Sequence, residues 1–129
     1  MSEALLLAER IEIIERGYEY LLAYAAQGRQ DDAGTELRET LTRMHAAMTD
    51  MQGSLLAAFA GLPEATGAKH FTEAVERDVL TARGALGIVL SRERISSLLV
   101  DNFNASVHMR ALLTDLFLVE QALKADPRG

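Results

Sequence analysis

The sequence predicts an all-α protein: one domain, residues 1–129, folded as an antiparallel four-helix bundle that runs up-down-up-down and pairs into a dimer. Three observations indicate this. Apolar residues recur at spacings of three and four almost throughout the 129 residues, which is the period of an amphipathic helix. Only 2 prolines interrupt the chain. The length suits one domain, and helices joined by short connections pack as an up-down bundle.

Composition excludes several classes of protein. With 49% hydrophobic and 25% charged residues, the chain is globular rather than disordered. It has no cysteine, so neither disulfides nor thiolate metal sites form. A net charge of -6 repels the phosphate backbone of nucleic acids and anionic membrane surfaces, so neither is an expected partner. No secretory signal and no run of about 18 apolar residues is evident, so we expect a cytoplasmic protein.

The first helix is predicted over residues 3–27 and the second over 32–60. Gly28 has the place of a left-handed cap after the first helix, and Asp31 and Asp32 offer side-chain oxygens at the start of the second. Pro63 follows its end. The expected core stripe of the first helix is Leu7, Ile11, Ile14, Tyr18, Leu21 and Ala25, and that of the second is Leu37, Leu41, Met44, Met48, Met51, Leu55 and Ala58.

The third helix is predicted over residues 65–91 and the fourth over 95–125. Their expected core stripes are Phe71, Val75, Val79, Ala82, Leu86 and Val89, and Ile95, Leu98, Asn102, Ala105, Met109, Leu112, Leu116, Val119 and Leu123. The two stripes are out of phase, and serines 91, 96 and 97 are possible caps, so we favour a turn near 91–96. One helix kinked near Gly84 or Gly87, with a domain-swapped dimer, is the alternative. Asn102 interrupts the fourth stripe and is expected either to fix register or oligomeric state or to contact a ligand.

The first and fourth helices each carry a second apolar stripe: Leu6, Ile13, Gly17, Tyr20 and Tyr24 on the first, and Leu99, Phe103, Val107, Leu113 and Phe117 on the fourth. Because the first and last helices of an up-down bundle are neighbours, we expect the stripes to merge into one surface patch. Patches of that size are typical of interfaces. The predicted interface residues of a homodimer are Tyr20, Tyr24, Leu99, Phe103, Leu113 and Phe117.

Methionine and histidine cluster on the second and fourth helices. Met44, His45, Met48, His108 and Met109 are ligand types that suit copper(I) or a haem iron. The methionines also lie on the predicted core stripes, and methionine fills irregular cores well. We therefore favour packing and predict no metal and no cofactor.

No catalytic pattern is evident. A di-iron bundle needs Glu-x-x-His on two helices, but Thr42, Gly67 and Ala105 stand three residues before the 3 histidines. Neither Gly-x-Ser-x-Gly nor a phosphate-binding glycine loop occurs. The sequence predicts that the protein is not an enzyme.

The opening helix ends Leu21-Leu22-Ala23-Tyr24-Ala25-Ala26-Gln27-Gly28 before a second long helix. In this segment and in size the chain resembles small helical flagellar export chaperones, although it has no tryptophan-containing turn. The resemblance implies a chaperone or adaptor that binds an amphipathic helix of another protein. We expect a non-enzymatic protein that acts through self-association and protein–protein contacts. The alternatives are the chaperone and, after it, a haem- or copper-binding bundle.

Overall fold

The structure, a computed structural model, describes residues 3–63 and 66–125. Over these residues the chain forms six helices and no strand: α1 (Glu3–Ala25), α2 (Leu37–Met48), α3 (Met51–Phe59), α4 (Ala68–Leu90), α5 (Ser97–Ala105) and α6 (Val107–Ala125). The all-α prediction is confirmed. The prediction of four helices is wrong, because the segments 32–60 and 95–125 are each divided in two. The predicted start at residue 65 lies outside the described residues.

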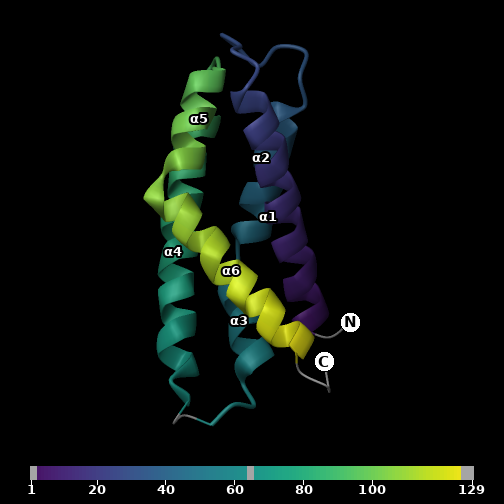
Figure 1. The fold of residues 1–129 in the computed structure, drawn as a ribbon, viewed down its shortest axis with the longest axis vertical. Helices are drawn as coiled ribbons and strands as arrows, with labels where there is room; N and C mark the ends of the chain where they lie inside the picture. The colour runs from purple at the N-terminus through teal and green to yellow at the C-terminus, as the bar shows by residue number, and fades with distance from the viewer. Residues whose placement is uncertain (1–2, 64–65, 126–129) are drawn as a thin grey trace.

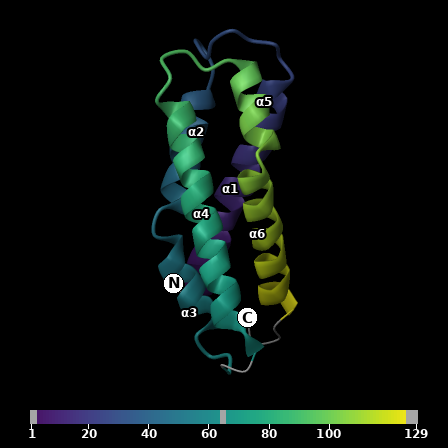
Figure 2. The same ribbon diagram turned by 90° about the vertical axis from the view of Figure 1, so that its left-hand side faces the viewer.

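The chain traverses the long axis of the molecule four times (Figures 1 and 2). α1 runs one way, α2 and α3 return, α4 runs back, and α5 and α6 return again. α1 and α4 each pack against both α2–α3 and α5–α6. One hydrophobic core, to which all six helices contribute, lies between them. The predicted core stripes of α1, of α2–α3 and of α4 are buried or half-buried throughout.

The first break separates α2 from α3 at Thr49 and Asp50. Asp50 has a left-handed backbone with φ 61°, which a residue with a short polar side chain adopts more readily than most. Arg10 of α1 donates hydrogen bonds to the carbonyl oxygens of Ala47 (3.0 Å) and Thr49 (2.7 Å). In a continuous helix these carbonyl oxygens would accept hydrogen bonds from backbone N–H groups of the same helix. The break preserves the phase of the core stripe, because Met48 and Met51 are both buried.

The second break, at Ser106, changes the phase of the core stripe. Ser106 is extended, with φ -56° and ψ 132°. On α5 the predicted core residues Leu98, Asn102 and Ala105 are exposed, and the residues buried there instead are Ser97, Val100, Phe103 and Asn104. From Met109 onward the predicted stripe is buried or half-buried. The prediction that Asn102 fixes register is therefore wrong: it is Asn104 that is buried, and its amide donates to the carbonyl of Leu21 (3.1 Å).

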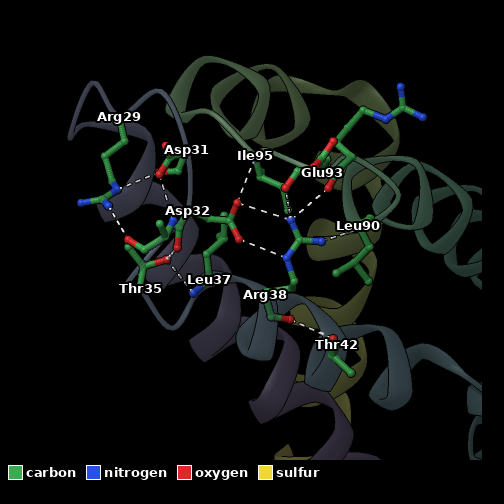
Figure 3. Close-up of polar contacts among 12 residues, drawn as sticks. Arg29, Asp31, Asp32, Thr35, Leu37, Arg38, Thr42, Leu90, Glu93 and Ile95 are labelled. Carbon is green, nitrogen blue, oxygen red and sulfur yellow. Dashed lines mark hydrogen bonds and ion pairs between the residues drawn. The ribbon is translucent and has the colours of Figure 1, made fainter.

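The turn between α4 and α5 is confirmed, since no helix spans residues 91–96. Figure 3 shows how it is held. The guanidinium of Arg38 donates to the carbonyl oxygens of Leu90 (3.0 Å), Arg92 (2.9 Å) and Glu93 (3.2 Å). Because the carbonyls at the end of a helix lack intrahelical donors, Arg38 of α2 caps α4 from outside. Ser96 caps α5 by accepting from Leu99 N–H (3.0 Å), so no single kinked helix exists here.

Asp32 links the same turn to the loop before α2 (Figure 3). Its carboxylate pairs with Arg38 (3.0 Å) and accepts from Ile95 N–H (3.0 Å). Burial alone raises the pKa of Asp32, but the hydrogen bonds from Arg38 and Ile95 outweigh burial and leave the pKa below 3.8. Asp32 is thus used in a tertiary contact. The predicted helix start at residue 32 is wrong, because α2 begins at Leu37.

Candidate functional site

Tyr24 is a core residue, which corrects its prediction as a surface residue. Its ring is 1% exposed, and its hydroxyl donates to the carbonyl oxygen of Ile95 (2.5 Å), with that of Asp31 3.1 Å away. Ser97 Oγ donates to Tyr24 carbonyl (2.7 Å) and accepts from Arg29 N–H (2.8 Å). The loops at residues 26–36 and 91–96 therefore cover Tyr24 and satisfy its hydroxyl. The periodicity of the sequence did not predict that Tyr24 is buried, because periodicity does not show which loops pack against a helix.

Phe103 and Leu113 are also buried, each 5% exposed. Phe103 lies on the core face of α5 because the break at Ser106 shifts the phase of the helix before it. Leu113 follows Leu112 on a wide core face of α6. Neither side chain is open to a partner, so the structure corrects their prediction as interface residues.

The other three predicted interface residues keep some exposure. Phe117 is 49% exposed, while Tyr20 and Leu99 are half-buried and pack against the core. Tyr20 is also stacked on Tyr24, with ring centroids 6.5 Å apart. Their role in an interface stays a prediction.

The second apolar stripes of the first and fourth predicted helices were expected to merge into one patch. They do not, because the second stripe of α1 lies next to α2. A Cβ added to Gly17 would overlap Cγ and Sδ of Met44, so the glycine allows α2 to approach α1 closely. Beside this contact lies a groove of about 650 Å³, which we name the α1–α2 groove. It is lined by Glu9, Glu12, Ile13, Arg16, Gly17 and Tyr20 of α1 and by Thr40 and Arg43 of α2.

The solvent side of α6 carries large apolar side chains. Val107, Phe117 and Leu118 are 68%, 49% and 58% exposed, and we name them the outward α6 face. With the exposed Arg110 and Thr114 between them, they recur at helical spacings and so share one side of the helix. Leu98 of α5 is 70% exposed. In Figure 1 α6 crosses in front of the other helices, so no other helix covers its outer side. Of these three residues, only Phe117 is among the predicted interface residues.

Two carboxyl groups meet where α4 packs on α6. Burial, then the hydrogen bond to Asp78 and its charge, raise the pKa of Asp115 from 3.8 to about 7. Asp115 Oδ2 is buried and has no donor among the described residues, which a proton shared with Asp78 would supply. Asp115 can therefore hold a proton up to near neutral pH. Burial and then Glu120 also raise the pKa of Glu15 on α1, although Lys124 opposes this.

The candidate metal ligands are separated by burial. Met44, Met48 and Met109 are at most 1% exposed and belong to the core, as the packing interpretation predicts. His45 is half-buried, and His108 is exposed on α6. Among the residues that the structure describes, no three His, Asp or Glu side chains are placed to hold a metal ion.

Within residues 3–63 and 66–125, no helix combines the length and the apolar character that a membrane span needs. Comparisons with protein-family models, with curated protein sequences and with solved structures gave no match to this chain.

Proposed function

We propose that this protein is a non-enzymatic, cytoplasmic four-helix bundle, two of whose helices are broken, and that it acts through protein–protein contacts. Its first partner is a second copy of the chain. The observation that carries the proposal is the outward α6 face, where Phe117 and Leu118 stand side by side and more than 45% exposed. Adjacent exposed apolar side chains of this size are typical of interfaces.

A two-fold pairing across α6 would bury this face twice. An aromatic side chain offers about 200 Å², so the 49% of Phe117 that is exposed is about 100 Å². At about 25 cal/mol per Å² its burial contributes about 2.5 kcal/mol per copy, and about 5 kcal/mol per dimer. This is enough for Phe117 to be a dominant residue of the interface.

The test is Phe117→Asp, with assembly mass measured by native mass spectrometry and by analytical ultracentrifugation. We expect the wild-type chain of 14.1 kDa to assemble as a multiple of its mass through this face, and Phe117→Asp to lose that contact while its helical circular dichroism stays unchanged. Leu80→Asp is the matched control, because Leu80 on α4 is 50% exposed and gains the same charge. An unchanged assembly mass in Phe117→Asp, or equal loss in Leu80→Asp, contradicts the proposal.

The second candidate is a chaperone or adaptor whose outward α6 face receives an amphipathic helix of another protein. Leu98 favours it, because this residue, 70% exposed, offers apolar surface on a second helix, α5. A wild-type chain that is monomeric and binds a hydrophobic dye, with the dye lost in Phe117→Asp, supports this candidate over the dimer.

A further inference from the structure

The α1–α2 groove is acidic at one end and carries basic residues further along. Glu9 and Glu12 occupy the end nearer the start of α1, Arg16 lies one turn further along, and Arg43 approaches from α2. Glu9 and Arg16 are seven residues apart, which on a helix is about 10 Å. The charges of the two acidic and two basic residues of the groove sum to zero, whereas the whole chain carries a net charge of -6.

This charge distribution matters for self-association. Two copies of a chain with a net charge of -6 repel one another over most relative orientations. The groove avoids that repulsion because it is neutral overall and dipolar. A two-fold axis that passes between Glu12 and Arg16, across antiparallel α1 helices, places Glu12 of each copy against Arg16 of the other.

The geometry of α1 suits this arrangement. Glu12 and Arg16 already form an ion pair of 2.8 Å, and both remain largely exposed at 57% and 77% of their side chains. Under the two-fold axis each guanidinium would lie between two carboxylates, its own and that of the second copy. Four charges of alternating sign then form one ring, a network rather than an isolated surface pair.

The lining of the groove supplies apolar contact beside the charges. Ile13 and Tyr20 are half-buried and line it, and Gly17 presents no side chain. Exposed ion pairs contribute at most about 1 kcal/mol each, so Ile13 and Tyr20 must provide much of the affinity. The charges then determine which partner and which orientation are accepted.

We propose that the α1–α2 groove is a second self-association site, where another copy of this chain docks antiparallel across α1 with Glu12 of each copy against Arg16 of the other. This contact is separate from the outward α6 face and needs none of its residues. A chain with both contacts forms assemblies larger than a dimer, and a chain with the groove alone forms a dimer.

The experiment uses full-length Phe117→Asp as the parent, so that only the groove remains for pairing. Glu12→Arg and Arg16→Glu are each added to this parent. We expect the parent to dimerise, with a Kd that rises with salt. Each charge reversal brings like charges together and should raise the Kd at least tenfold. An equimolar mixture of the two reversals should restore the parent Kd as a heterodimer, which mass spectrometry distinguishes because the two variants differ in mass.

The mixture also controls for folding, because a variant that failed to fold would not be rescued by its complement. Asp101→Arg, added to the same parent, makes the same change of charge at an exposed position of α5 outside the groove and should leave the Kd within twofold. A monomeric parent, reversals without effect, or a mixture that stays monomeric would each overturn the groove proposal. A monomeric parent leaves the α6 proposal standing, whereas a wild-type mass unchanged by Phe117→Asp but reduced by Glu12→Arg overturns the α6 proposal instead.

Discussion

Asp115→Asn should stabilise the protein at neutral and higher pH. Asp115 of α6 shares a partly buried site with Asp78 of α4, and burial and then the Asp78 carboxylate raise the pKa of Asp115. An amide at position 115 keeps the size of the side chain and donates to Asp78, which removes the like-charge repulsion. The substitution therefore acts on the packing of α4 against α6.

The sign and size of the effect follow from the raised pKa. The folded chain holds this proton more tightly than the unfolded chain, so the free energy of unfolding falls as the pH rises from 3.8 to about 7 and is constant above that. At about 1.4 kcal/mol per pH unit, full exclusion of water would give about 4 kcal/mol. Because Asp115 is only half-buried, solvent screening reduces the expected effect to about 1–2 kcal/mol.

Urea unfolding followed by circular dichroism, between about pH 5 and about pH 8, measures this difference. We expect Asp115→Asn to exceed the wild type by about 1–2 kcal/mol at the upper pH, and the two proteins to converge as the pH falls. Asp101→Asn, at an exposed position of α5, removes a charge without touching the pair and should have no such dependence. Equal stability of Asp115→Asn and wild type at both ends of the range would refute the shared proton.

Two further substitutions test packing by the same urea assay. Gly17→Ala should lower the free energy of unfolding by about 1–2 kcal/mol, because its Cβ would overlap Met44 and this overpacking outweighs the helix propensity of alanine. Gly84→Ala is the control: its Cβ meets nothing within 4 Å, so it should raise the free energy of unfolding by up to about 1 kcal/mol. A gain at both sites would contradict the close approach of α1 and α2. Tyr24→Phe removes a buried hydroxyl that donates to the turn after α4 and should cost about 1–2 kcal/mol, whereas an equal loss in Tyr20→Phe, on a half-buried ring, would show that the hydrogen bond is not the cause.

Periodicity predicted the core of most of the chain, and the break at Ser106 shows where it stopped. No glycine or proline lies between Ile88 and Ala125, so one long helix with two apolar stripes was the natural interpretation of residues 95–125. In the structure the stripe with Phe103 faces the core before Ser106, and the stripe with Met109 faces it afterwards. The apparent second stripe is in part the same core surface, displaced by the break.

Polar contacts between residues far apart in the chain could not be predicted from the sequence. Asp32 has a residue type and a position that suit the cap at the start of a helix, and the neighbouring sequence gives no sign of another role. Its partners are Arg38, six residues on, and Ile95, 63 residues on. Tyr24 likewise has an apolar ring and a polar hydroxyl, which suit an interface, until Ile95 is found to accept its hydrogen bond. Such assignments depend on which loops meet, and periodicity carries no information about that.

The acidic residues have different roles, and together they place the pH of maximum stability below neutrality. The lowered pKa of Asp32 means that its contribution is present above 3.8 and is lost as the pH falls below that value. The raised pKa of Asp115 means that stability declines as the pH rises toward about 7. Glu15, whose pKa is also raised by burial and by Glu120, acts in the same direction as Asp115. Partial protonation further reduces the self-repulsion of a chain with net charge -6, so the free energy of unfolding should peak between about pH 4 and about pH 6.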